Sequence, residues 1–249
     1  MSSAAPLGVM LRGLRLPSML LHYEALAQRA EQEGSSFVQY LQRLCETELE
    51  GRAGRRTARL LKAAHLPEGK TLASLDLKQF PLKLQRQLPV LVDGGFVQRS
   101  ENVLAFGLPG RGKTHLISAI ARELIVQHGY TVLFTSTFTL VQQLLAAKRD
   151  LRIEPLLRQL DRFAVVVLDD IGYVQQNREE MEVLFTFLAE RYERRSLMIT
   201  SNLVFSEWDK IFKDPMTTAA AIDRLVHHSM ILELDGASYR AKHARENKG

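Results

Sequence analysis

A glycine-rich stretch that follows an apolar segment constrains this chain more than any other feature. From Gly107 to Thr114 the sequence reads GLPGRGKT, which matches the pattern G-x-x-x-x-G-K-[ST]. An apolar strand is expected at residues 103–106, and a helix from Lys113 onward. Glycines let backbone N–H groups curl around phosphate oxygens without a Cβ clash, and a helix start adds the positive end of its dipole. Strand, loop and helix in this order predict a phosphate-binding site in an α/β domain.

The side chains of this loop have chemical roles in binding ATP and Mg²⁺. Lys113 supplies a cation for the β- and γ-phosphates, and Thr114 offers a hydroxyl to Mg²⁺. A chance glycine-rich turn is the alternative, and the flanking strand and helix argue against it. The residues expected to bind the nucleotide are Gly107, Leu108, Pro109, Gly110, Arg111, Gly112, Lys113, Thr114 and His115.

A second signal is an apolar segment that ends in two acids. Residues 165–168 are all apolar and are followed by Asp169 and Asp170. Such a strand delivers carboxylates to the carboxyl edge of the sheet, where open α/β sheets bind ligands. We expect Asp169 to hold Mg²⁺ through water and Asp170 to orient or deprotonate the attacking water. Both acids could instead cap a helix, but their place one strand after the loop favours the catalytic interpretation.

The next expected strand closes with three polar residues, in the run Ile199-Thr-Ser-Asn202. If this strand lies between the other two, Asn202 would sit near the γ-phosphate. The alternative is that Asn202 caps a following helix. The site chemistry predicted by these motifs is positioning of the reactants with neutralisation of charge, as phosphoryl transfer requires.

Strands alternate with helices after about residue 83, which predicts a parallel sheet covered on both faces. Before that point only helices are expected, including a capping box at Ser36 and Gln39 and a separate third helix from Arg55 to His65. The fold class is therefore α/β, with a small all-α N-terminal domain. The predicted domains are a helical one at 1–66, a linker at 67–82 and an ATPase domain at 83–249. The five expected strands are 103–106, 131–135, 164–168, 197–200 and 230–234.

The chain is basic, with a net charge of +5 and a pI of about 9.4, which fits a polyanionic partner. Two clusters could neutralise DNA phosphates, although a solvated helix face is the alternative for each. No base-reading motif accompanies them, so little sequence preference is expected. Without an apolar run of about 18 residues or a clear secretory signal, no membrane contact and a cytoplasmic location are expected. The candidate DNA-binding residues are Arg52, Arg55, Arg56 and Arg59, and Lys148, Arg149, Arg152 and Arg158.

Four motifs together resemble the IstB family of AAA+ ATPases, which are encoded beside the transposase in one class of bacterial insertion sequences. They read GLPGRGKTHL, VVVLDDIGY, ITSN and AAAIDRLVHH. The first two motifs are common among P-loop ATPases, whereas the Ile-Gly-Tyr after the acids and the Ile-Asp-Arg-Leu-Val-His-His run are narrower. The resemblance extends from about Leu14 to Arg240. The helicase loader DnaC has a similar ATPase core and gives the second interpretation.

The resemblance implies that Lys113 and Thr114 form Walker A, that Asp169 and Asp170 form Walker B, and that Asn202 is sensor 1. Arg224 matches the arginine finger, which acts across a subunit interface. The catalytic residues would then be Lys113, Asp170, Asn202 and Arg224.

The family further implies a homo-oligomer that assembles on duplex DNA with ATP and Mg²⁺ and directs a transposase to target sites. The helical N-terminal domain would dock DNA or the transposase. Two departures from common AAA+ patterns stand out. Asp170 replaces the usual glutamate, which predicts slow turnover that DNA or assembly stimulates, and too few residues follow Arg224 for a C-terminal lid.

Three other functions compete with regulation of transposition. A helicase loader would copurify with a helicase instead of a transposase. A small-molecule kinase would need an acceptor pocket with a lid, and the sequence suggests neither. A nucleotide-bound scaffold that never hydrolyses ATP is left open by the Asp169-Asp170 pair.

Overall fold

The computed structural model describes residues 6–173, 178–203, 207 and 215–234. Contacts divide the chain into two compact units, Met1–Arg59 and Leu60–Gly249. The division falls inside a helix, earlier than the linker at 67–82 that the sequence predicted as the boundary. Among the described residues, no helix is both long and apolar enough to cross a bilayer.

The first unit consists of α1 (Leu7–Gly13), α2 (Pro17–Gln32) and most of α3 (Phe37–Ala63). The capping box at the start of α3 is confirmed, because Ser36 N–H donates to Gln39 Oε1 at 2.8 Å and Gln39 N–H donates to Ser36 Oγ at 3.3 Å. The prediction of a separate third helix from Arg55 is wrong, since α3 continues without a break to Ala63. Its glycine at position 51 serves packing: a Cβ there would overlap Ser18 Oγ.

A buried carboxylate joins α2 to α3. Glu48 accepts hydrogen bonds from the N–H groups of Ser18 and Met19, at 2.8 and 3.2 Å, and from Arg52 and Arg55, each at 3.0 Å. Burial alone would raise the pKa of Glu48, but the bonds from Arg52 and from the N–H groups of Met19 and Ser18, with the charge of Arg52, outweigh burial and lower the pKa. The two arginines therefore stabilise the packing of the N-terminal helices.

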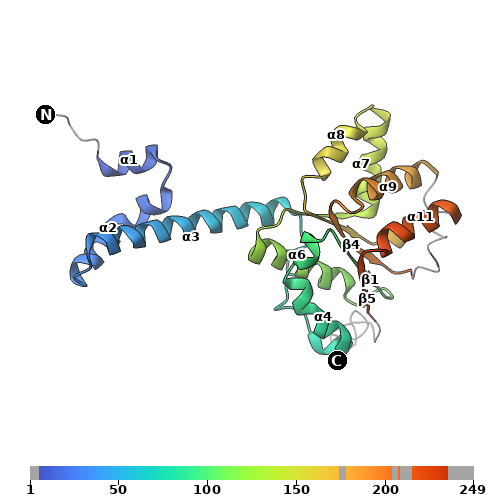
Figure 1. Cartoon of the computed structure of the whole chain (residues 1–249), viewed down its shortest axis with the longest axis horizontal. Helices are drawn as coiled ribbons and strands as arrows, with labels where there is room; N and C mark the ends of the chain where they lie inside the picture. Colours follow the sequence, from blue (N-terminus) through green and yellow to red (C-terminus); the bar gives the residue numbers. More distant parts are fainter. Residues whose placement is uncertain (1–5, 174–177, 204–206, 208–214, 235–249) are drawn as a thin grey trace, which may run out of the picture. The chain divides into compact units, whose positions relative to one another are not determined.

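The second unit is built on a five-stranded parallel sheet in the order β2-β3-β4-β1-β5 (Figure 1). All five expected strands are confirmed, with end shifts of a few residues. β4 lies between β3 and β1, which is the arrangement that Asn202 required in order to lie near a γ-phosphate. The strands are β1 (Asn102–Phe106), β2 (Val132–Ser136), β3 (Val165–Asp169), β4 (Ser196–Ser201) and β5 (Ser229–Glu233).

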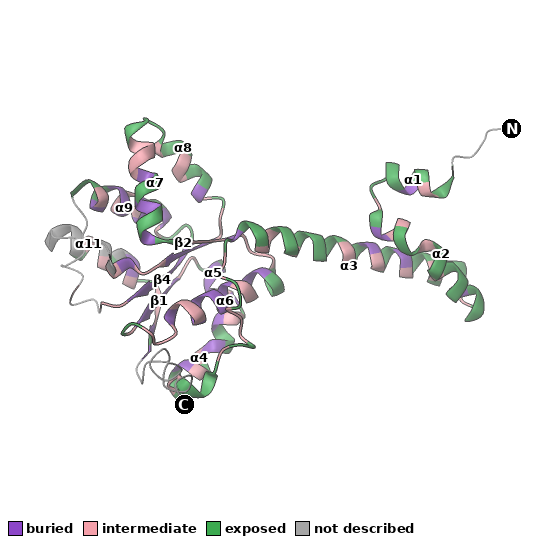
Figure 2. Ribbon diagram, turned by 180° about the vertical axis from the view of Figure 1, so that it is seen from behind, coloured by how far each residue is buried: buried purple, intermediate pink, exposed green. Residues whose placement is uncertain are grey.

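Helices cover both faces of the sheet, as the continuous apolar strands predicted. On one face α4, α5 and α6 pack on side chains such as Val103 and Val167, and on the other α7, α8, α9 and α11 pack on side chains such as Leu104 and Leu168. Figure 2 shows the inner strands β1, β3 and β4 almost wholly buried between these layers, whereas the edge strands β2 and β5 are partly exposed. The helical segments are η1 (Leu77–Gln79), α4 (Leu82–Val92), α5 (Gly95–Gln98), α6 (Lys113–His128), α7 (Thr137–Arg149), α8 (Ile153–Leu160), η2 (Ile171–Tyr173), α9 (Arg178–Arg191) and α11 (Pro215–Val226).

Candidate nucleotide site

The glycine-rich loop joins the end of β1 to the start of α6 in a conformation that requires glycine. Gly107 has φ +152° and Gly112, which caps α6, has φ +83°. A Cβ at Gly107 would lie 2.6 Å from the carbonyl oxygen of Leu234. Gly107 N–H donates to Ser201 O at 3.3 Å, and Leu234 N–H donates to Phe106 O at 2.8 Å. Both strands that flank β1 thus hold the start of the loop in place.

Lys113 lies folded back against this loop. Its side chain is almost fully buried, and Nζ donates to the carbonyl oxygens of Gly107 at 2.5 Å and Leu108 at 3.1 Å. The ammonium group is therefore held at the loop that the sequence assigns to phosphates. A positive charge that the fold already holds in place can bind a phosphate oxygen without a large ordering cost.

A hydrogen-bonded cluster of oxygens lies beside the loop, where β3 and β4 end. Asp169 Oδ1 accepts from Thr114 Oγ1 at 2.9 Å and from Thr200 Oγ1 at 2.7 Å. The carboxylate and the Thr114 hydroxyl are hard oxygen donors on two different elements, as Mg²⁺ prefers. The structure thus brings together the two side chains that the sequence predicted as metal ligands, and their chemistry fits the ion.

Asp170 is the strained residue of the site. Its φ of +61° is in the left-handed region, and its N–H donates to Thr200 Oγ1 at 2.8 Å. Its Oδ1 is buried without a hydrogen-bond partner among the described residues. Burial raises the pKa of Asp170 and the charge of Asp169 raises it further, while Lys113 acts in the opposite direction. A strained residue with an unsatisfied oxygen marks a position shaped for function.

Asn202 lies against the turn that follows the two acids. Its Oδ1 is also buried without a hydrogen-bond partner in the described part of the chain. In η2 a Cβ at Gly172 would overlap this oxygen, so the turn needs glycine for Asn202 to approach. Arg111 Nη1 is likewise buried and has no hydrogen-bond partner among the residues that the structure describes. Three unsatisfied polar atoms at the carboxyl edge of the sheet, on Arg111, Asp170 and Asn202, fit a polar ligand bound there.

Thr200 is the site residue that sequence reasoning missed. Its side chain is 1% exposed, and its hydroxyl both donates to Asp169 and accepts from Asp170. Thr200 belongs to the polar run at 200–202, but only Asn202 of that run was predicted as a site residue. The available signal was a hydroxyl in an otherwise apolar strand beside the acid-bearing strand, since such a buried group needs a partner.

Two predicted site residues lie elsewhere. The ring of His115 contacts the linker, because Nε2 lies 3.1 Å from both Ser74 Oγ and Thr71 O. Arg224 belongs to α11, and its side chain lies outside the described residues. The carbonyl of the next residue, Leu225, accepts from Asn102 Nδ2 at 3.3 Å at the start of β1. The backbone at Arg224 therefore lies at the edge of the sheet opposite the glycine-rich loop of its own chain.

The candidate DNA-binding residues fall into two groups. Arg52 and Arg55 bind Glu48, Lys148 pairs with Glu182 at 3.0 Å, and Arg158 pairs with Glu154 at 3.5 Å. The other four are exposed and form no ion pair with another described residue, and these are Arg56, Arg59, Arg149 and Arg152. The second group is the better candidate for contact with phosphates, because its charges are not already neutralised.

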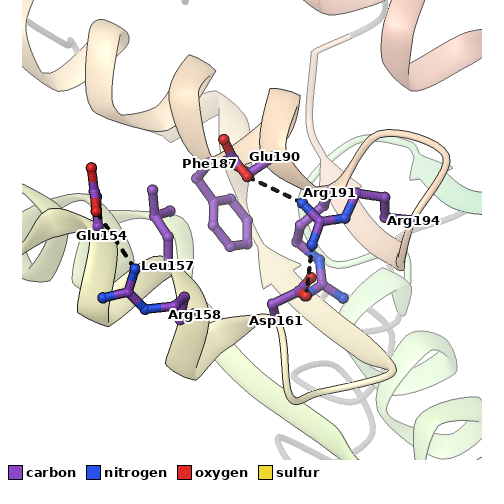
Figure 3. A pocket seen from close by; sticks show the side chains of 8 residues that line it. All are labelled: Glu154, Leu157, Arg158, Asp161, Phe187, Glu190, Arg191 and Arg194. Carbon is purple, nitrogen blue, oxygen red and sulfur yellow. Dashed lines mark hydrogen bonds and ion pairs between the residues drawn. The ribbon is translucent and has the colours of Figure 1, made fainter.

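A separate pocket of about 270 Å³ lies between α8 and α9 (Figure 3). Its Arg191 is 2% exposed and donates to the carbonyl oxygens of Leu160, Phe163 and Ser196, each at 3.0 Å. Burial lowers the pKa of Arg191 to about 10. At the rim, Arg194 binds Asp161 and Glu190. Because these arginines already have partners, we interpret them as stabilising the packing of α8 and α9 and not as a second anion-binding site.

Comparison with known proteins gives matches over most of the chain. The profile of the family described as IstB-like ATP binding protein matches residues 9–247. An insertion-sequence ATP-binding protein of Sinorhizobium fredii is 44% identical over 98% of this chain and 82% of its own. The IS21 ATP-binding protein of Pseudomonas aeruginosa is 38% identical over 96% of this chain and 90% of its own.

Solved structures confirm the AAA+ fold. The DnaC helicase loader superimposes with a TM-score of 0.55 at 16% identity, over 71% of this chain and 99% of its own. DnaA bound to AMPPCP and single-stranded DNA gives 0.58 at 17% identity, over 74% of this chain but only 55% of the DnaA chain. Together with the family match over residues 9–247 and the two relatives at 44% and 38% identity, these findings show that the chain belongs to the IstB-like ATP-binding protein family, on an AAA+ fold.

Proposed function

We propose that the chain is an ATP-dependent DNA-binding ATPase that assembles on duplex DNA and directs a transposase to target sites. The observation that carries the ATPase part is the cluster of Thr114, Asp169 and Thr200 beside the glycine-rich loop, with the strained Asp170 next to it. A phosphate-binding loop, oxygen ligands for a metal ion and a carboxylate that can orient water occur together there. Hydrolysis of a phosphoanhydride requires groups of these three kinds.

In the proposed reaction, a bound Mg²⁺ would neutralise charge on the β- and γ-phosphate oxygens. Thr114 and Asp169 would hold the ion, and Lys113 would bind the phosphates. Asp170 would orient the attacking water and accept its proton at Oδ1 or Oδ2, and the amide of Asn202 would help position the γ-phosphate. Asp170 is one methylene shorter than the glutamate of many related enzymes, which supports slow turnover in the absence of DNA or assembly.

Assembly and DNA binding are supported by the placement of basic residues. Because the backbone at Arg224 lies at the sheet edge opposite the loop, this arginine could complete only the site of a neighbouring subunit. Arg149 and Arg152, exposed and without an ion pair to another described residue, give the second unit a surface for phosphates. In this proposal residues 83–249 form the ATPase domain, 67–82 the linker, and 1–66 a domain that docks DNA or the transposase.

The transposase is proposed as partner because the relatives with the highest identities shown above are named for insertion sequences. The likeness to DnaC supports a helicase loader as the second candidate, but at 16% identity it shows the fold alone. Copurification of the tagged chain with a transposase or with a replicative helicase separates the two functions.

Size-exclusion chromatography with light scattering tests assembly directly. The protein is run with random-sequence duplex DNA, with and without ATP and Mg²⁺. We expect a large DNA-bound oligomer only when ATP is present, because Arg224 of one subunit would contact the nucleotide of the next. A monomer that is indifferent to both ligands would contradict the proposal and would favour a scaffold role.

Replacing Thr200 by valine tests the buried hydroxyl. The side chain keeps its shape but loses its bonds to Asp169 and Asp170. A hydrogen bond to a charged group contributes about 1.5–3 kcal/mol, so hydrolysis should fall roughly 10- to 100-fold. Binding of a fluorescent ATP analogue should change by less than about threefold.

Serine at the same position is the control, since Thr200→Ser retains the hydroxyl and should recover most of the activity. Turnover of Thr200→Val at the wild-type rate would show that Thr200 does not position the acids. An equal loss in the serine variant would point instead to a packing role for the methyl group.

A further inference from the structure

The turn between α7 and α8 holds an apolar side chain in solvent. Leu151 is 92% exposed, although the helices on either side bury Leu144 and Leu160 in the core. α7 and α8 lie side by side in Figure 1, and α7 also packs on α9. The leucine therefore stands at the tip of a helical hairpin that is itself well supported.

The backbone at this tip is fixed. Leu151 N–H donates to Lys148 O at 3.2 Å and Arg152 N–H donates to Ala147 O at 2.7 Å, which closes the end of α7 in the manner of a Schellman cap. This cap needs one residue in the left-handed conformation, usually a glycine. Leu151 occupies that position, with φ +55°. Any other L-residue crowds its Cβ against the chain in this conformation.

Leucine is thus unfavourable here for two independent reasons, its backbone conformation and its exposure to water. Six described residues other than glycine have positive φ, and Leu151 is the apolar one among them; the other five are Arg15, His65, Ser100, Asp170 and Glu193. A residue that is unfavourable in both backbone conformation and solvation is a candidate for a contact made outside the chain.

The surroundings of Leu151 indicate the chemistry of its partner. Its immediate neighbours are Asp150 and Arg152, and Arg149 precedes Asp150. Both arginines are exposed without an ion pair to another described residue. Residues 148–158 contain four basic and two acidic side chains, a net charge of +2. A protein interface buries about 800 Å² on each partner and has an apolar centre, which one leucine between charged residues cannot provide. An apolar side chain near two arginines fits DNA, where such side chains wedge between base pairs.

We propose that Leu151 inserts between stacked base pairs of duplex DNA from the minor groove, while Arg149 and Arg152 bind the adjacent phosphates. This inference rests on the DNA binding proposed above and adds a mode of binding to it. Wedging of this kind unstacks one step and bends the duplex by roughly 20–90°. Because the hairpin tip is rigid before binding, little ordering entropy opposes the insertion.

Three measurements on one duplex, all made with ATP and Mg²⁺, test the wedge. The fluorescence of 2-aminopurine in the duplex reports unstacking, and energy transfer between fluorophores at its two ends reports bending. Fluorescence anisotropy reports the affinity of the protein for the duplex. Leu151→Asn keeps a residue that tolerates the left-handed conformation and removes the apolar group. We expect it to bind DNA within about threefold of the wild type and to lose the unstacking and bending signals.

Three further variants separate the possible causes. Leu151→Met should keep the signals, and Leu82→Asn, at another exposed leucine, should leave them unchanged. The double variant Arg149→Ala/Arg152→Ala should lose about tenfold or more in affinity and bind with a shallower salt dependence. Thermal melts identify any variant that has lost its fold.

The outcomes distinguish this inference from the function on which it rests. If the wild type binds DNA but Leu151→Asn unstacks and bends it equally, the wedge is refuted and the proposed function stands. If the wild type shows no DNA binding with ATP, the proposed function itself fails. A change in oligomer size on Leu151→Asn without DNA would assign the leucine to contact between copies and would also overturn the wedge.

Discussion

Replacing Lys113 by alanine is expected to abolish ATP binding at ordinary nucleotide concentrations. The ammonium group is held against the loop by the carbonyl oxygens of Gly107 and Leu108. Loss of a buried charge that pairs with phosphate costs roughly 2–5 kcal/mol, so affinity should fall at least about 30-fold. Titration with a fluorescent ATP analogue measures this change. The ATP-dependent oligomer on DNA should disappear in the same variant.

The control for this experiment is Lys83→Ala, which removes an exposed lysine from α4 of the same unit. It should bind ATP as the wild type does. Thermal melting of Lys113→Ala shows whether the protein remains folded, since the substitution also removes two hydrogen bonds within the loop. Unchanged nucleotide affinity in a folded Lys113→Ala protein would rule out this loop as the phosphate site.

Replacing Asp170 by asparagine should separate ATP binding from hydrolysis. Asparagine has nearly the same shape and tolerates the left-handed conformation that Asp170 adopts. It cannot accept a proton from water, and loss of a general base typically reduces turnover by about 10²–10⁴-fold. Single-turnover hydrolysis and nucleotide titration together measure the two effects. The protein should bind ATP within about threefold of the wild type and remain assembled on DNA.

Asp93→Asn, an exposed acid at the end of α4, is the matched control and should hydrolyse ATP normally. Turnover of Asp170→Asn at the wild-type rate would remove Asp170 from catalysis. If the wild type and the variant were equally inactive while both bound ATP and DNA, the chain would be a nucleotide-bound scaffold instead of an enzyme.

The sequence predicted the sheet and the main site motifs because each is encoded by a short stretch of consecutive residues. Each of these stretches is shorter than about ten residues: the apolar strands, the glycine spacing and the paired acids. Local patterns of this kind can be recognised from sequence alone. Strand alternation also predicted the layers on both faces. The placement of Asn202 near a γ-phosphate depended on β4 lying between β1 and β3, and this strand order is known only from the structure.

The features that sequence did not predict depend on contacts between distant residues. Thr200 acquires its role only when β4 places it beside Asp169 and Asp170. Arg52 and Arg55 were predicted to bind DNA phosphates, with a solvated basic face as the alternative, but both pair with Glu48, which is buried beneath them. α3 continues past Gly51, a residue type that weakens an isolated helix but here leaves room for Ser18. In each case a partner many residues away decides what the local pattern means.

The two ends of β1 have a consequence for any assembly. One end leads into the nucleotide loop, and at the other Asn102 binds the backbone of Leu197, Leu225 and His228, next to Arg224. A subunit that offers Arg224 to its neighbour therefore uses one edge of its sheet for this contact. Its own nucleotide loop, at the opposite edge, receives the arginine of another subunit. Repeated in one sense, such contacts are heterologous and head-to-tail, and they produce either a closed ring or a helical filament. A filament would have a direction, and its two terminal subunits would differ, one having an incomplete site and the other an unused arginine.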